Sequence, residues 1–155
     1  MHYERPTFAE IKAAIRATFP TQGDPELGLS PDSISRYFDA AGIKLPWQPV
    51  PNWSENDLGR RGFTNQEFMS VLFSPLSPEP DERVFAVTDE AIWEGKQLGF
   101  SFTFKDLLLF AEQIYPKLMS RPMDFFQPSD MIILAPASKL LVLLHHEGHR
   151  VQFTH

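Results

Sequence analysis

Three histidines near the carboxyl end of the chain form the one constellation whose residue types could do chemistry. They occur in the run His145-His146-Glu147-Gly148-His149, which also supplies a carboxylate. Imidazole nitrogen and carboxylate oxygen are ligands that zinc and similar ions accept in proteins. The spacing differs from the helical His-Glu-x-x-His motif, and the glycine disfavours a helix at this point.

The flanking residues predict that this run lies at the tip of a β-hairpin. Residues 140–144 and 150–154 are both strand-like. A two-residue turn at Glu147-Gly148 would join them, because glycine readily adopts positive φ. The register that follows pairs these residues across the strands: His146 with His149, Leu144 with Val151, and Val142 with Phe153.

In this register His146 and His149 would share one face of the hairpin, close enough for one metal ion to contact both. Glu147 or His155 could then supply a further ligand. Three readings stay open for the histidines: polar turn residues beside the core, a pH-sensitive or partner-contacting cluster, and the metal site of a small enzyme. The first is the simplest, so we expect no cofactor and no catalytic residue.

A second candidate site is an acidic segment over residues 79–94. The chain of 155 residues has a formal net charge of −6, and six carboxylates against Arg83 alone give this segment a charge of −5. The segment predicts a docking surface for a basic protein partner, a solvated strand edge, or paired carboxylates for acid–base catalysis. The six carboxylates are Glu79, Asp81, Glu82, Asp89, Glu90 and Glu94.

Two tryptophans are the remaining candidate partner-binding residues. They lie in residues 45–53, a stretch with three prolines. Prolines at this spacing forbid a helix and a central strand, so an extended loop is predicted. Trp47 and Trp53 would either fold back onto the core, as the usual burial of tryptophan favours, or anchor a partner.

The first half of the chain predicts short amphipathic helices. Capping boxes at Thr7–Glu10 and Thr64–Glu67 each begin a helix, since the side chains at both ends of the box bond unpaired backbone N–H groups. Ser30-Pro31 begins another helix, and Gly42 is a suitable left-handed terminator for it. Helices of this length are not stable alone and require a core to pack on.

The second half predicts a small antiparallel sheet. Residues 83–88, 98–102 and 131–134 are strand-like and precede the hairpin. Residues 104–118 predict an amphipathic helix, which Pro116 should end or kink near Tyr115. The fold class is therefore α+β, with short amino-terminal helices followed by a sheet whose carboxy-terminal meander packs under one amphipathic helix.

Length and composition limit the class of protein. We expect one domain over residues 1–155, with a proline-rich break at 74–80 between a helical first half and a strand-rich second half. The chain has no cysteine, which excludes disulfides and thiol catalysis. Net negative charge argues against nucleic-acid binding, and no stretch is long enough for a membrane span. The only compact basic spot, residues 59–62, predicts a solvated turn.

The stretch from Asp130 to Pro136 and from Leu143 to Phe153 resembles the terminal meander of many small bacterial proteins. Several of these are immunity proteins that neutralise a cognate toxin. The resemblance implies a cytoplasmic, non-catalytic inhibitor that docks on a toxin, and it assigns no functional residue because immunity surfaces differ between families. We therefore expect a protein-binding module of this kind, whose partner is a basic toxin domain. The alternatives are a small metal-dependent enzyme using His145, His146 and His149, and an accessory subunit of a larger assembly.

Overall fold

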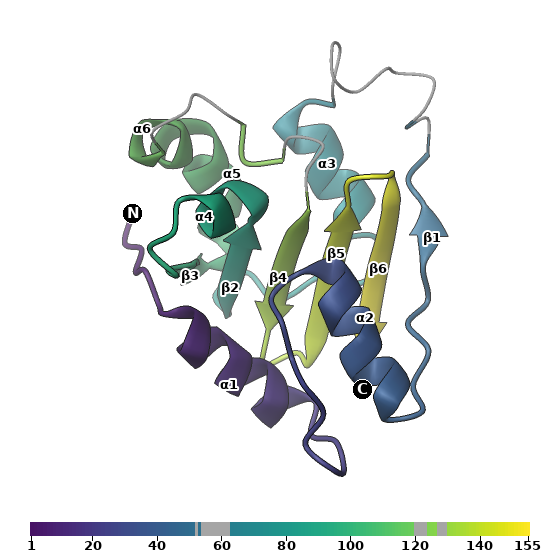
Figure 1. Ribbon diagram of the computed structural model, residues 1–155. Helices are drawn as coiled ribbons and strands as arrows, with labels where there is room; N and C mark the ends of the chain where they lie inside the picture. Colours follow the sequence, from purple (N-terminus) through teal and green to yellow (C-terminus); the bar gives the residue numbers. More distant parts are fainter. Residues whose placement is uncertain (52, 54–62, 120–123, 127–129) are drawn as a thin grey trace.

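A six-stranded antiparallel sheet with the strand order β1-β6-β5-β4-β2-β3 lies at the centre of the computed structural model (Figure 1). The structure describes residues 1–51, 53, 63–119, 124–126 and 130–155, so the basic spot at 59–62 lies outside the described residues. The strands are β1 Gln48–Pro49, β2 Arg83–Thr88, β3 Phe100–Thr103, β4 Met131–Ala135, β5 Leu140–His145 and β6 His149–Thr154. The predicted α+β class, with its antiparallel carboxy-terminal strands, is confirmed.

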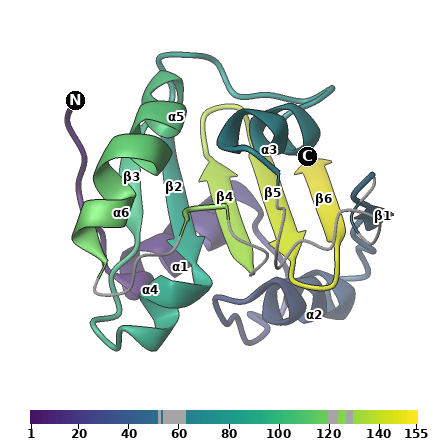
Figure 2. The ribbon, with the colours of Figure 1, turned by 90° about the horizontal axis from the view of Figure 1, so that it is seen from above.

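Helices cover both faces of the sheet (Figure 2). Helices α1 (Phe8–Thr18) and α2 (Pro31–Ala40) lie on one face, and α3 (Asn65–Leu72), α5 (Leu107–Leu109) and α6 (Tyr115–Leu118) lie on the other. Successive strand residues therefore enter different cores: Leu141 and Leu143 pack toward α1 and α2, whereas Val142 and Leu144 pack toward the opposite side. Burial on both faces explains why β4 and β5 are hydrophobic at nearly every position.

The predicted helix starts are present. Thr7 and Glu10 form a complete capping box at α1, and Thr64 and Glu67 form another at α3. The Ser30 side chain accepts a hydrogen bond from the backbone N–H of Ser33 and so caps α2. Each cap satisfies N–H groups that have no partner within the helix, which is why these local signals are readable from sequence.

The helix predicted over residues 104–118 is present, but Pro116 does not end it. A 3₁₀ turn at Phe104–Asp106 leads into α5, a π-helical stretch follows at Phe110–Ile114, and α6 continues to Leu118. Proline has no N–H and cannot make the bond to the carbonyl four residues earlier. The wider π-helical turn ends at Ile114, two residues before the proline, and interrupts the regular hydrogen-bond pattern there.

The β5–β6 hairpin differs from the predicted register by one residue. His145 pairs with His149 and Leu143 pairs with Val151, across a three-residue turn at 146–148. Gly148 ends the turn with φ +88° and donates its N–H to the carbonyl of His145 at 2.9 Å, a common geometry for three-residue hairpin loops. The predicted pairs are therefore wrong: His146 with His149, Leu144 with Val151, and Val142 with Phe153.

Contacts with α3 account for the observed register. A one-residue shift moves every side chain of a strand to the other face of the sheet. Arg150 and Gln152 thereby lie on the α3 side, where Arg150 Nη1 donates to the carbonyl of Val71 at 2.5 Å and Gln152 Nε2 donates to that of Leu72 at 2.6 Å. These carbonyls are at the end of α3 and would otherwise lack partners.

The proline-rich loop predicted at residues 45–53 contributes an edge strand to the sheet. Gln48 pairs with Arg150 and Pro49 with His149, which gives the short strand β1 its place beside β6. Proline is tolerated there because an edge strand leaves one row of backbone groups outside the ladder. Residues 74–80 contain no helix or strand, in agreement with the predicted break. Among the described residues, no helix has both the length and the apolar character required to cross a membrane.

Candidate functional site: the histidine end of the sheet

One end of the sheet brings the histidines together with half of the acidic segment. Antiparallel pairing sets Thr88 of β2 beside Met131 of β4, Met131 beside Leu144 of β5, and His145 beside His149 of β6. The residues that follow β2 and β5 and precede β4 and β6 therefore meet at this edge. We call it the histidine end, defined by Asp130, His145, His146 and His149.

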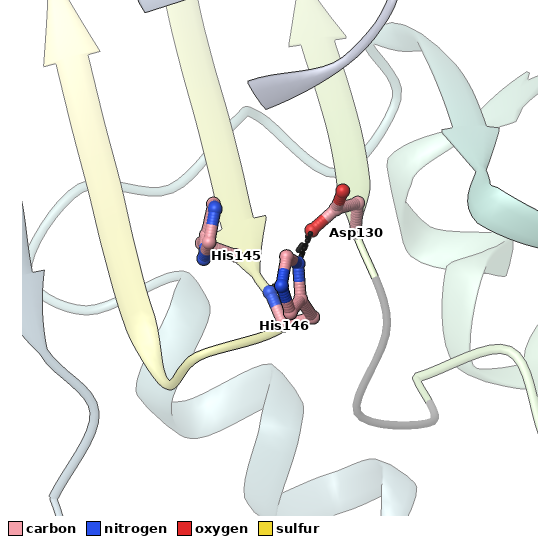
Figure 3. Close-up of side chains that lie close together, drawn as sticks. All are labelled: Asp130, His145 and His146. Carbon is pink, nitrogen blue, oxygen red and sulfur yellow. Dashed lines mark hydrogen bonds and ion pairs between the residues drawn. The ribbon is translucent and has the colours of Figure 1, made fainter. Parts of the chain in front are cut away.

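His146 is held by Asp130 (Figure 3). The Oδ1 atom of Asp130 accepts the backbone N–H of His146 at 2.9 Å and lies 2.9 Å from its Nδ1. This hydrogen bond to the carboxylate raises the pKa of the His146 imidazole above its ordinary value of 6.5. Asp130 thus favours the positively charged form of a histidine whose side chain is 53% exposed.

We expect an imidazole titration by NMR to show this effect directly. His146 should titrate with a midpoint above 6.5, and Asp130→Asn should return the midpoint toward that value. Because the folded-state pKa is the higher one, the stability from this pair is complete below the unfolded pKa and is lost as pH rises through the folded pKa. An unchanged His146 midpoint in Asp130→Asn would contradict the assignment.

His145 is oriented from both sides. Its Nδ1 accepts the backbone N–H of Glu147 at 3.1 Å, so the neutral ring carries its proton on Nε2. Nε2 lies 3.3 Å from Oδ1 of Asp32, in the first turn of α2. The ring also stacks on that of His146, with 4.2 Å between centroids, and its side chain is only 12% exposed.

Two groups within the described residues have ligand atoms close enough for a metal ion. The atoms of Asp130, His145 and His146 lie within 4.8 Å of one another, and so do those of His145, Glu147 and His149. The predicted pairing of His146 with His149 occurs in neither group. His155, named as a further ligand, instead stacks on Phe153 at the other end of β6.

The acidic segment is divided between the two ends of β2. Glu79, Asp81 and Glu82 precede the strand, and the other three carboxylates follow it. Six strand residues at about 3.4 Å each hold the two halves about 20 Å apart. The six carboxylates therefore do not form one continuous surface, although they lie within one short stretch of the sequence.

At the end of β2 far from the histidines, the Glu82 side chain stabilises the fold through hydrogen bonds. It is 8% exposed, accepts the backbone N–H groups of Glu79 at 3.1 Å and Ser138 at 2.6 Å, and bonds the Ser138 hydroxyl. It thereby ties the start of β2 to the turn between β4 and β5. Asp81 is exposed, and its hydrogen bond with Lys105 at 2.7 Å lowers the pKa of its carboxyl.

At the histidine end, the three remaining carboxylates belong to helix α4 (Asp89–Trp93): Asp89 and Glu90 form its first turn, and Glu94 is its C-cap. Burial, with the nearby charge of Asp130, raises the pKa of Asp89. Glu90 Oε2 accepts the Tyr115 hydroxyl at 3.1 Å, and Glu94 Oε1 pairs with Arg5 at 3.3 Å. Within the described part of the chain, Glu90 Oε1 and Glu94 Oε2 are buried without a hydrogen-bond partner.

The two predicted tryptophans are half-buried and pack against the core. Trp47 donates its indole N–H to the Ser35 hydroxyl at 3.2 Å and lies edge-on to His145. Trp53 lies against Gly148, where any side chain would collide with the indole ring. Both tryptophans therefore fold back onto the core, which is the alternative that the sequence favoured.

The tryptophan that sequence reasoning missed is Trp93, which is 81% exposed at the end of α4. Its neighbour Ile92 is also exposed, whereas Ala91 provides the buried contact of this short helix. An indole between acidic residues, just before Gly95, is the sequence signal that could have identified it. Because tryptophan is highly buried on average, the sequence alone would predict a buried ring, and only the structure shows that this ring is exposed to solvent.

Comparison of the chain with protein-family models, with curated proteins and with solved structures finds no match.

Proposed function

We propose that this protein is a protein-binding module that docks a basic partner through α4. The observation that carries the proposal is the exposed indole of Trp93, which follows the exposed Ile92 in α4 and forms a hydrogen bond with Asp89. The acidic residues Glu90 and Glu94 belong to the same short segment of chain. We call these five residues the Trp93 patch. It combines an aromatic anchor with an acidic border, the arrangement expected of an interface centre.

The energetics favour a macromolecular partner at this position. A tryptophan side chain buries about 150–250 Å² on association, which corresponds to about 4–6 kcal/mol of transfer free energy at about 25 cal/mol per Å². Ordering and desolvation consume part of that gain. Tryptophan is nevertheless enriched among interface residues whose truncation costs at least about 2 kcal/mol, because it contributes a large contact area with few rotatable bonds.

The charges of the Trp93 patch indicate the sign of the charge on the partner surface. Glu94 already pairs with Arg5 and Lys96, and Glu90 is engaged by Tyr115. Asp89 forms a hydrogen bond with the Trp93 side chain and lies near His146, but burial and the charge of Asp130 still raise the pKa of its carboxyl. A basic group from a partner would relieve the repulsion between Asp89 and Asp130, so a lysine- or arginine-rich surface fits best.

The specific form of the proposal is a cytoplasmic immunity protein that neutralises a cognate bacterial toxin. Three observations support it: the resemblance of the terminal meander to such proteins, the small acidic chain, and a candidate binding surface that protrudes on a short helix. Carboxylates would steer association with a basic toxin domain and fit a surface that normally binds phosphate. The other half of the acidic segment, at Glu79 and Asp81, adds long-range charge without an aromatic anchor.

The test searches the neighbouring genes for a toxin domain and measures affinity for it by calorimetry across ionic strength; the absence of binding to any such domain would count against the immunity form of the proposal. Trp93→Ala should weaken binding at least about thirtyfold, equivalent to about 2 kcal/mol, while the free energy of unfolding changes by less than about 0.5 kcal/mol. Asp89→Asn should reduce both the association rate and its salt dependence. Growth rescue in cells that express the toxin gives an independent readout.

Two control variants are matched to this design. Leu109→Ala removes another exposed apolar side chain away from α4, and Glu79→Gln removes an exposed carboxylate at the opposite end of β2. Both should bind within about threefold of the wild-type protein. Equal affinity of Trp93→Ala and wild type at every salt concentration would overturn docking through α4.

A further inference from the structure

The corrected hairpin register places two histidines directly opposite each other. His145 and His149 are the last residue pair of the β5–β6 ladder, and both belong to the set of alternate residues that faces α2. Directly opposed residues have Cβ atoms about 4.5–5.5 Å apart, so one ion between the strands can reach a nitrogen of each ring. Glu147 is in the turn between them, and the ligand atoms of all three residues lie within 4.8 Å of one another.

We propose that the tip of the hairpin binds a divalent transition-metal ion of the zinc class through His145, Glu147 and His149. Two imidazoles and one carboxylate are a donor set that zinc accepts with a further position open. Ligand atoms about 2.0–2.2 Å from a tetrahedral ion lie about 3.3–3.5 Å apart. The ligand atoms therefore need to approach one another by up to about 1.4 Å, which side-chain rotation of the exposed Glu147 and His149 allows.

Asp32 provides an independent indication. Histidines that bind metal generally donate their other ring N–H to a carboxylate, which orients the ring and increases its basicity. Asp32 Oδ1 lies 3.3 Å from Nε2 of His145, and Nδ1 faces the turn, where it accepts the N–H of Glu147 at 3.1 Å. Nδ1 is therefore the ligand atom, and the ion would replace that N–H as its partner.

The surrounding charge also favours a cation. The Asp32 carboxylate lies 3.3 Å from His145 Nε2, and the carboxylates of Glu147 and Asp130 each lie within 4.8 Å of a His145 ring nitrogen. A divalent ion at the tip would add positive charge beside these carboxylates. The site does not depend on partner binding at the Trp93 patch.

The other histidine group, Asp130 with His145 and His146, is a poorer site. Asp130 Oδ1 already accepts the backbone N–H of His146 and bonds its Nδ1, both at 2.9 Å. An ion held there would break these bonds, whereas binding at His149 and Glu147 breaks only the single bond to His145 Nδ1. His146 is thus the matched control residue: it is adjacent to the proposed ligands and stacks on one of them, but it is not a ligand.

The experiment is a zinc titration of the full, untagged chain against a chromophoric chelator. We expect one equivalent of Zn²⁺ to bind at micromolar or lower concentration, His149→Ala and Glu147→Gln each to weaken binding at least tenfold, and His146→Ala to remain within threefold. Zinc should also raise the melting temperature of the wild-type protein, because a ligand that binds only the folded state stabilises it.

Cobalt(II) replaces zinc as a spectroscopic probe. Intense visible absorption from a four-coordinate site should form with wild-type protein and with His146→Ala, and should be lost in His149→Ala. Less than a tenth of an equivalent of bound zinc would overturn the proposal. Wild-type zinc affinity in both His149→Ala and Glu147→Gln would also overturn it. Loss of binding in His146→Ala with full binding in His149→Ala would assign the ion to the Asp130 group instead. Because Glu147 lies exposed in a turn, Glu147→Gln keeps the test valid if His149→Ala folds poorly.

Discussion

Leu143→Ala is expected to lower the free energy of unfolding by about 3–5 kcal/mol, measured by urea denaturation at constant pH. Leu143 has no exposed surface and lies in the middle of β5, where it packs with Ile132 and Val151 beneath α1 and α2. A central strand with helices on both faces cannot collapse around a missing side chain. The cost therefore includes the cavity as well as the lost transfer free energy.

A double-mutant cycle makes the same measurement a test of the hairpin register. Leu143 and Val151 are directly opposed on one face, so their alanine variants should couple by about 0.5–3 kcal/mol. Leu144 lies on the opposite face of the sheet from Val151 and is the control for this pair. Coupling of Leu144 with Val151 that exceeds that of Leu143 would show that the strands pair one residue out of the observed register.

Glu82→Ala is expected to destabilise the fold by about 3 kcal/mol, measured in the same denaturation experiment. The substitution leaves the backbone N–H groups of Glu79 and Ser138 without their acceptor in a site that is 8% exposed. Hydrogen bonds to charged groups contribute about 1.5–3 kcal/mol each, and an unsatisfied buried donor costs about 1–3 kcal/mol. Water that enters at this edge of the sheet offsets part of the loss.

Glu79→Gln is the control for this prediction. Glu79 is exposed, and its contact with Glu82 is through the backbone, so its side chain should contribute less than about 0.5 kcal/mol. A loss in Glu82→Ala no larger than that in Glu79→Gln would mean that the carboxylate of Glu82 does not hold the β4–β5 turn. The result bears on partner binding as well, because reversing the charge of Glu82 would destabilise the fold and so confound any measured effect on an interface.

The acidic segment shows how a one-dimensional pattern changes in three dimensions. Along the sequence, residues 79–94 carry a charge of −5 and resemble one patch. In the structure a buried strand separates its halves, and the side chain of Glu82 is directed inward while Asp81 pairs with Lys105. In the half that follows β2, Asp89 lies near Asp130 and His146, whereas Glu90 bonds Tyr115 and Glu94 pairs with Arg5.

The candidate site was predictable in its residue types but not in its partners. Histidine chemistry at the hairpin tip was visible in the run 145–149, and that run is at the tip. The predicted pair of His146 and His149 was wrong, because a three-residue turn ending at Gly148 makes His145 the partner of His149. Asp32 and Asp130 had no local signal at all, since α2 and β4 bring them from distant positions in the sequence.

The sequence by itself determined the helix starts at Thr7, Ser30 and Thr64, strand β2, and the α+β class, because each depends on contacts between residues a few positions apart. Tertiary structure decided the hairpin register, the division of the acidic segment and the exposure of Trp93. Each of these depends on which distant groups share a face: the carbonyls at the end of α3 that Arg150 and Gln152 satisfy, and the single buried contact at Ala91 that leaves the indole in solvent. Local spacing carries no information about such contacts, since they form only when the sheet and its helices are assembled.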